Sequence, residues 1–255
     1  MKLHDSLQRG VEKLFFKNKS TIWSKRITYM IGNVILMLIL FYILLNTIAY
    51  DWTGSLYPEG TGYRLDWVFG GLDNLIPFVP EMAIFYVFLF YSMVIITMIY
   101  FTFIASDKGY ALGWALVIIN FIAIIVYIFF PVSTYWYRLD LLAHPLTGNP
   151  WAQLMYAYYS YDTSFNCFPS LHAAVSTAMA YTWYRYSKIK PLKITISISI
   201  IAIITAIGVI LSTLFVKQHY IADEIAGVLL AYVVVKYTFK KCWKAFERPV
   251  TEKIQ

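Results

Sequence analysis

The chain has 255 residues, of which 60% are hydrophobic and only 14% are charged. Soluble domains carry about 25% charged and about 45–50% apolar residues, so a soluble core of this length cannot hold so many apolar side chains. The composition predicts an all-α integral membrane protein. We interpret the formal net charge of +7 as a sign of membrane topology and not of nucleic-acid binding.

The N-terminal residues 1–26 are basic and carry apolar side chains at Leu7, Val11, Leu14 and Phe15. This spacing places one apolar stripe on a helix and favours a cytoplasmic segment lying on the membrane surface. A solvated basic tail is the alternative. The apolar run that follows is too long for a cleavable signal peptide, so we expect it to stay as an anchor.

Six apolar segments follow, and each is long enough or nearly long enough to cross a hydrocarbon layer of roughly 30 Å. They lie near residues 27–49, 81–104, 111–131, 170–186, 194–215 and 221–239. If the chain crosses six times, all but three of its 21 Lys and Arg residues share one side with both termini. The charge asymmetry therefore predicts six transmembrane helices with both termini in the cytoplasm.

The three exceptions are Arg64, Arg138 and Lys217, which fall in the outward connections. The two long outward loops are rich in Tyr and Trp, and we interpret these side chains as interfacial anchors in preference to a ligand cage. The predicted organisation is an interfacial segment over 1–26, a six-span membrane domain over 27–240 and a basic cytoplasmic tail over 241–255.

Two short stretches carry histidines at the predicted outward ends of helices. "FPSLHAA" begins the fourth segment with His172, and "STLFVKQHYIAD" joins the fifth segment to the sixth with His219 and Asp223. Residues four apart share a helical face, so the Asp223 carboxylate can fix the tautomer of His219. His172 is then a candidate for a second acid or base. An ionisable residue at membrane depth is by default a functional hypothesis.

The surroundings of these residues suit a phosphate. Ser170 and the backbone N–H groups at the start of the fourth segment form a helix N-terminus, which attracts anions. Lys217 and Arg138 are the outward cations near the two stretches. Each also has a simpler interpretation, because Ser170 is a typical N-cap and both cations are able to snorkel to the interface. The spacing of the His and Cys residues does not suggest a metal site. The two cysteines, Cys167 and Cys242, do not suggest a disulfide.

Together the two stretches resemble the type 2 phosphatidic acid phosphatase superfamily. Its second motif is Pro-Ser-Gly-His, and this chain has Pro-Ser-Leu-His over residues 169–172. Its third motif is Ser-Arg, five residues, His, three residues, Asp, which Ser212, His219 and Asp223 match in type and spacing. The sequences of both stretches resemble those of the inositol phosphorylceramide synthase-like branch. The resemblance covers roughly residues 130–230.

The resemblance implies a helical-bundle catalytic core over about 111–240 and a reaction without metal or other cofactor. His219 would attack phosphorus to form a phosphohistidine, Asp223 would orient it, and His172 would protonate the leaving oxygen. Arg138, Ser170, Lys217 and Ser212 would bind the phosphate. The chain departs from the family where Thr213 and Leu171 replace Arg and Gly, and the first motif is absent as such.

We therefore expect a lipid phosphate phosphatase of a bacterial plasma membrane, with its active site on the extracytoplasmic face. Its substrate would be phosphatidic acid, phosphatidylglycerol phosphate or a polyprenyl diphosphate. The alternative is a phosphotransferase in which a lipid or sugar hydroxyl replaces water. A transporter or an inactive lipid-binding protein is a third hypothesis, because membrane His and Asp also occur in proton relays. The oligomeric state is not predicted.

Overall fold

The computed structural model describes residues 22–40 and 52–240, with the side chains of 22–26 left out. Most of the predicted interfacial segment, the end of the first apolar segment and the predicted tail from residue 241 therefore lie outside the described residues. Within the described ranges the chain is helical and contains no β-strand, apart from an isolated bridge between Tyr63 and Val132. The prediction of an all-α protein is confirmed for this part of the chain.

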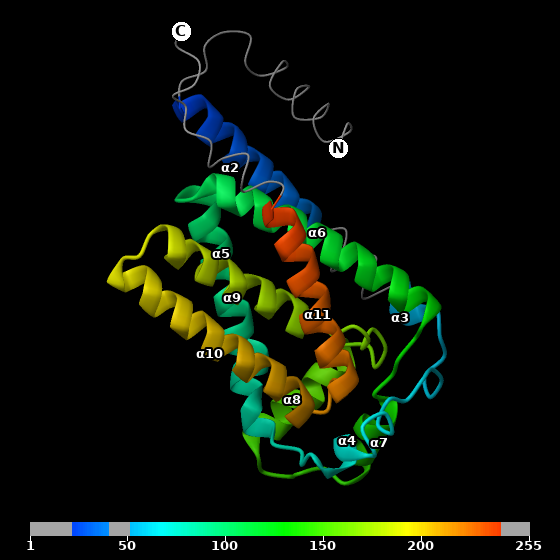
Figure 1. Cartoon of the computed structure of the whole chain (residues 1–255). Coiled ribbons are helices and arrows are strands. Elements are labelled where there is room, and N and C mark those ends of the chain that lie inside the picture. Colours follow the sequence, from blue (N-terminus) through cyan, green and yellow to red (C-terminus); the bar gives the residue numbers. More distant parts are fainter. Residues whose placement is uncertain (1–21, 41–51, 241–255) are drawn as a thin grey trace, which may run out of the picture.

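The chain turns back within a few residues after residues 103 and 189, whereas residues 130–170 form a long connection that contains two short helices (Figure 1). In chain order the helices are α2 (Ile22–Ile39), α3 (Thr53–Ser55), α4 (Leu72–Leu75), η2 (Pro80–Met82), η3 (Ile84–Leu89), α5 (Phe90–Phe103), α6 (Ser106–Phe129), α7 (Tyr135–Ala143), α8 (Pro150–Tyr161), α9 (Leu171–Ile189), α10 (Lys193–Phe215) and α11 (Ile221–Thr238).

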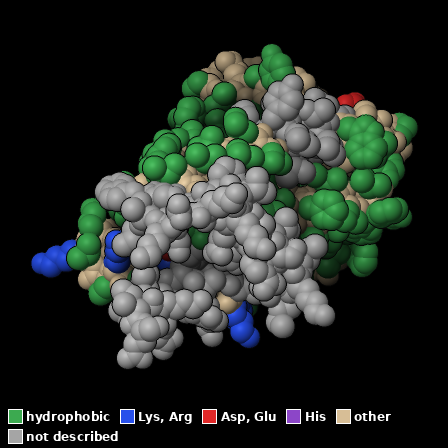
Figure 2. Space-filling view, turned by 90° about the horizontal axis from the view of Figure 1, so that it is seen from above, with side chains coloured by type: hydrophobic (Ala, Val, Ile, Leu, Met, Phe, Trp, Pro, Cys, Tyr) green, Lys and Arg blue, Asp and Glu red, His purple; other side chains and the backbone are tan. Residues whose placement is uncertain are grey.

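Three helical stretches are long and apolar enough to cross a membrane, namely Pro80–Phe103, Ser106–Phe129 and Lys193–Phe215. Helices α9 and α11 match two further predicted segments, but they are not among these three. Both carry polar side chains that are buried against other helices, including Ser176, Thr182 and Glu224. The outer surface in Figure 2 is largely hydrophobic wherever it is not covered by the grey residues. The number of spans and the side of the termini stay predictions.

The core lies where α6, α9 and α11 pack against one another, with α10 against α9 and α2 against α6. Small side chains of α9, Ala174 and Ala178 among them, are fully buried and let the neighbouring helices approach closely. Nearer the C-terminal end of α9, Trp183 packs against Phe101 of α5 and donates its indole N–H to Thr97 of the same helix at 2.9 Å.

The beginnings of α9 and α11 meet at the end of the bundle that carries α4, α7 and α8 (Figure 1). The backbone N–H of Ser170 donates to the carbonyl of Asp223 at 3.0 Å. Asp73, just before the end of α4, accepts the N–H of Ile221 at 2.8 Å and so caps α11. These bonds place the first turns of two helices side by side, under the long connections.

Gly227 permits this close approach of α9 and α11. A Cβ at this position would lie 2.3 Å from the carbonyl oxygen of Ser170 and 3.0 Å from the Cβ of Ala173. We expect Gly227→Ala to lower the free energy of unfolding by about 1–3 kcal/mol, the usual cost of overpacking. Thermal unfolding in detergent measures the effect. Leu229→Ala on the exposed face of the same helix is the control, and an equal loss in both variants would contradict the interpretation.

Candidate active site

Two irregular segments bring the predicted histidines together. His172 lies in the first turn of α9, and His219 lies in the connection between α10 and α11; their ring centroids are 5.7 Å apart. Each segment turns through a residue in the left-handed region, Asn166 with φ 63° and Lys217 with φ 55°. Such conformations are uncommon outside glycine and occur where tertiary contacts impose them, often at functional sites.

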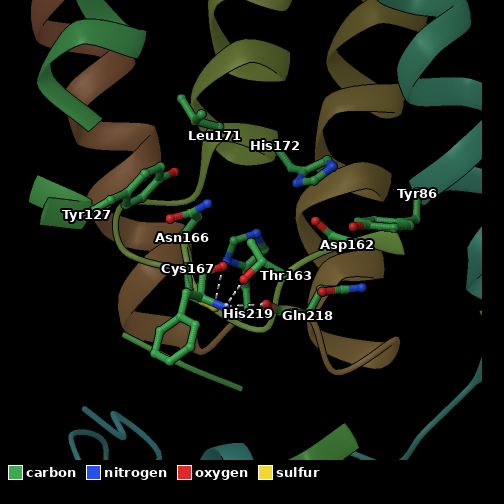
Figure 3. A pocket seen from close by; sticks show the side chains of 11 residues that line it. Tyr86, Tyr127, Asp162, Thr163, Asn166, Cys167, Leu171, His172, Gln218 and His219 are labelled. Carbon is green, nitrogen blue, oxygen red and sulfur yellow. Dashed lines mark hydrogen bonds between the residues drawn. The ribbon is translucent and has the colours of Figure 1, made fainter. Parts of the chain in front are cut away.

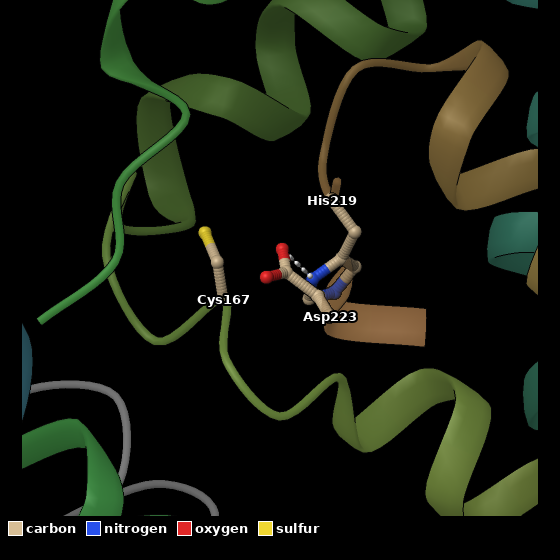
Figure 4. Close-up of side chains that lie close together, drawn as sticks. All are labelled: Cys167, His219 and Asp223. Atoms are coloured by element: carbon tan, nitrogen blue, oxygen red, sulfur yellow. Dashed lines mark ion pairs between the residues drawn. The ribbon is translucent and has the colours of Figure 1, made fainter. Parts of the chain in front are cut away.

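His219 and Asp223 form a buried pair at the start of α11 (Figure 4). The Nδ1 atom of His219 lies 3.4 Å from Oδ2 of Asp223, which also accepts the backbone N–H of Tyr220 at 2.8 Å. Nδ1 faces the carboxylate, so Nε2 is the ring nitrogen left for a reaction. Burial lowers the pKa of His219 to about 3, which keeps the imidazole neutral and nucleophilic at neutral pH.

Both histidines line one small cavity with about 20 Å³ of free volume, room for about one water molecule (Figure 3). A substrate phosphate enters this cavity only if side chains of the wall move apart. The lining side chains mix neutral polar and aromatic groups with one carboxyl group: Tyr86, Tyr127, Asp162, Thr163, Phe165, Asn166, Cys167, Leu171, His172, Gln218 and His219. None of these residues is a Lys or an Arg.

Aromatic rings hold His172 from the side of α5. Tyr86 lies in the π-helical turn η3, and its ring centroid is 4.6 Å from that of His172. The ring of Phe90, one turn further on, lies 4.8 Å away. Single π-helical turns occur frequently at functional sites because they redirect side chains within a helix. Here the turn places a tyrosine in the cavity wall.

Arg138, a predicted phosphate ligand, lies behind the wall of the cavity. From α7 its guanidinium donates to the carbonyls of Asp162 at 2.5 Å and Thr163 at 2.9 Å, and to the side-chain amide of Gln218. It also lies 3.5 Å from the Asp162 carboxylate. Arg138 is 5% exposed, so these contacts use it as a clamp between the two site segments.

The other three predicted phosphate ligands are likewise absent from the cavity lining. Lys217 donates to the backbone carbonyls of Asp73 and Ile76, and the hydroxyl of Ser212 donates to the carbonyl of Val209 at 2.7 Å. The Ser170 hydroxyl accepts the N–H of Ala173 at 3.2 Å as an N-cap. The arrangement does not support direct phosphate binding by these side chains, because each is engaged in holding a helix end or a loop.

The position after Ser212, where the resemblance leads one to expect Arg, also supplies no cation to the cavity. Thr213 is fully buried, and its hydroxyl donates to the carbonyl of Ile210 at 2.7 Å. The anion attraction that remains comes from the N-terminus of α9, where Leu171 and His172 line the cavity.

Cys167, His219 and Asp223 form a cluster that the sequence spacing did not indicate, with potential ligand atoms within 4.8 Å of one another. The Cys167 thiol donates to the carbonyl of Ser164 at 3.2 Å and has the carbonyl of Gln218 at 3.6 Å. Carbonyl oxygens around the sulfur disfavour a thiolate, and burial raises the pKa of Cys167 well above its ordinary value. The donor set therefore fits a protonated thiol beside an imidazole–carboxylate pair better than a metal centre.

Asp162 supplies the carboxyl group of the cavity lining, and the sequence analysis did not single it out. Its side chain is 14% exposed, lies beside Tyr86 and faces the same space as His172 (Figure 3). Burial raises its pKa to about 6, although Arg138 opposes the shift. Asp162 and Asn166 fall in the short polar stretch directly before the Pro-Ser-Leu-His motif, and that position was the available signal. Tyr86 gave none, since it is one of many aromatics in an apolar segment.

The comparisons with known proteins agree with the two motifs. Residues 143–247 match the family model described as the PAP2 superfamily, which confirms the predicted resemblance over this segment. The chain is similar to the inositol phosphorylceramide synthase catalytic subunit AUR1 of Saccharomyces cerevisiae, with 29% identity over 135 residues. That match covers 47% of this chain and 31% of the yeast protein, so the chain spans about a third of its length. No solved structure matches the chain significantly.

Replacing Arg138 tests its role as a clamp. Arg138→Lys keeps the charge but cannot reach two carbonyls and an amide at once. Each buried acceptor left without a donor costs about 1–3 kcal/mol, so we expect the free energy of unfolding to fall by about 2 kcal/mol or more. The matched control is Arg64→Lys, since Arg64 is 45% exposed, pairs with Asp66 and lies over the ring of Trp136. A fully stable Arg138→Lys protein with weakened substrate binding would instead restore Arg138 as a phosphate ligand.

The raised pKa of Asp162 predicts how pH affects stability. The folded-state pKa of about 6 lies above the model-compound value of 3.8, so the folded protein binds more protons in this window. Stability is then lost as the pH rises from 3.8 through about 6. We expect Asp162→Asn to gain thermal stability relative to the unmodified protein across this window and to keep that difference up to pH 8. Asp140→Asn, at an acid that is 79% exposed, should show no such trend.

Proposed function

We propose that this protein cleaves a phosphate ester of a membrane lipid by phosphoryl transfer to His219. The observation that carries the proposal is the juxtaposition of two buried histidines in one cavity, with a carboxylate on the far nitrogen of one of them. A nucleophile, its orienting group and a separate acid are the groups that an in-line displacement at phosphorus needs. Membership of residues 143–247 in a superfamily with this chemistry supports the same roles.

In the first step the Nε2 atom of neutral His219 forms a bond to phosphorus, and the bond from phosphorus to the lipid oxygen breaks. His172 gives its proton to the departing oxygen. Asp223 holds the His219 ring and balances the positive charge that develops on it. In the second step water attacks phosphorus, the bond to Nε2 breaks, and His172 takes back a proton. The products are inorganic phosphate and a lipid alcohol, or a lipid monophosphate where the substrate is a diphosphate.

A lipid substrate follows from the apolar bundle around the site, which accepts acyl or prenyl tails from the side. We propose phosphatidic acid, phosphatidylglycerol phosphate or a polyprenyl diphosphate as substrate. The charge asymmetry of the sequence supports six spans and a site on the extracytoplasmic face of a plasma membrane, in our proposal a bacterial one. None of these steps uses a metal ion, in keeping with the protonated thiol beside the pair.

Head-group transfer is the second candidate, because the yeast protein to which the chain is similar is a synthase by its name. A lipid or sugar hydroxyl would then replace water in the second step. The roles of His219, Asp223 and His172 are the same in both reactions. The product separates them, since hydrolysis yields free phosphate and transfer yields a new phosphorylated lipid.

The test is phosphate release by the full chain in detergent micelles with EDTA present, over phosphatidic acid, phosphatidylglycerol phosphate and undecaprenyl diphosphate. We expect release by the unmodified protein and a loss of roughly a thousandfold or more in His219→Ala, which lacks the nucleophile. His144→Ala is the control, because the side chain of His144 is 82% exposed and not among the cavity residues. Release that persists in His219→Ala would contradict the mechanism, and a phosphorylated lipid without free phosphate would favour transfer.

A further inference from the structure

The cavity contains an acidic group for which the proposed reaction has no role. Asp162 lines it together with His172 and His219, whereas Asp223 is fully buried behind His219. A carboxylate near a phosphoryl group is unfavourable by Coulomb's law, and only one guanidinium, that of Arg138, lies behind it. This electrostatic repulsion suggests that Asp162 binds a reacting group other than the phosphate.

An ionised carboxylate only accepts hydrogen bonds, so its partner must carry a proton. Fully ionised phosphate oxygens do not offer one, but a hydroxyl group does. In an in-line reaction the leaving oxygen of the first step and the incoming oxygen of the second step both lie opposite Nε2 of His219. The side of the cavity away from His219 presents His172 and Asp162 (Figure 3). The incoming oxygen is therefore the group within reach of both.

We propose that Asp162, together with His172, binds the hydroxyl that attacks the phosphohistidine, and that this hydroxyl belongs to water. The inference rests on the proposed function of His219. Water carries two O–H bonds, and on the side of the cavity away from His219 the imidazole of His172 and the carboxylate of Asp162 supply one acceptor each. An alcohol has a single O–H and would leave one acceptor unpaired. Before any phosphoryl group is bound, the cavity already has a free volume of about 20 Å³ among polar groups, room for about one water molecule.

The protons and bonds balance in this step. The water oxygen bonds to phosphorus as the bond from phosphorus to Nε2 of His219 breaks, and the electron pair returns to the imidazole. One water proton passes to His172, which became neutral when it protonated the lipid oxygen. The other proton stays on the new phosphate while it is hydrogen-bonded to Asp162. Asp162 remains ionised throughout, held by Arg138 at 3.5 Å.

The experiment separates the two half-reactions. The full chain in detergent micelles is mixed with phosphatidic acid labelled with ³²P and quenched in alkaline SDS, because phosphohistidine survives base. Phosphoenzyme and free phosphate are then measured together. In Asp162→Asn we expect phosphate release to fall by roughly a hundredfold, the cost of misplacing one reacting group, while the trapped phosphoenzyme increases. Asn keeps an oxygen for Arg138, and Asp140→Asn is the matched control at an exposed acid.

The unmodified protein offers a second arm that does not depend on the folding of a variant. Lowering the pH through about 6 protonates Asp162 and should likewise slow release and raise the phosphoenzyme level. The cation that faces Asp162 is Arg138 of α7, at 3.5 Å. The other titratable groups that face Asp162 are Tyr86 of η3, Tyr127 of α6, Tyr159 of α8, Cys167, His172 of α9 and His219. His172 changes its protonation state during the reaction, so only the part of the pH dependence that Asp162→Asn removes is assigned to Asp162.

Each other outcome overturns a defined part of the scheme. If phosphoenzyme and release fall in proportion in Asp162→Asn, or if neither changes, Asp162 does not act in the second step. If the unmodified phosphoenzyme persists in water but is discharged by added 1-octanol or glycerol, the hydroxyl is that of an alcohol. If the unmodified protein turns over without phosphoenzyme and His219→Ala remains active, the proposed function itself fails.

Discussion

The geometry of the site depends on one buried guanidinium. Arg138 joins three parts of the chain that are far apart in sequence, because it donates from α7 to the carbonyls of residues 162 and 163 and to the side chain of Gln218. These bonds hold the segment that contains Asp162 at a fixed position relative to the segment that contains His219. Arginine suits this task since its donors form a rigid planar fork that remains charged when buried. The cavity between the segments is a consequence of this clamp.

The clamp also explains how a nearly dry site holds several ionisable groups. His219 stays neutral because burial penalises its charged form, Cys167 stays protonated among carbonyl oxygens, and Asp162 shares the charge of Arg138. Substrate phosphate would thus enter a cavity that is close to electrically balanced. Under the proposed function, reactivity would come from the position of neutral groups and from the N-terminus of α9, in place of a cluster of cations.

The sequence predicted the helices and the pairing of His172 with His219 because both depend on local patterns, apolar periodicity and the spacing of two motifs. It did not reveal that the four predicted phosphate ligands lie outside the cavity lining, since a cation near a motif does not show its hydrogen-bond partners: Lys217 donates to the carbonyls of Asp73 and Ile76. Phosphate binding by these four residues stays a prediction. The sequence also did not point to Asp162 and Tyr86 as residues of the cavity. Their positions are set by tertiary contacts, such as those of Arg138 with Asp162 across 24 residues and with Gln218 across 80 residues, and no local pattern carries this information.

The π-helical turn at Ile84–Leu89 has an evolutionary consequence. A π turn accommodates one residue more than an α turn, and in an α-helix one residue corresponds to roughly 100° of rotation. Loss of a single residue here would restore a regular helix and swing the preceding residues around its axis. Tyr86 would leave His172, and Phe85 would leave the surface of α10 at Gly208, where it now packs. Descendants of this protein can therefore exchange side chains along this stretch far more easily than they can shorten it.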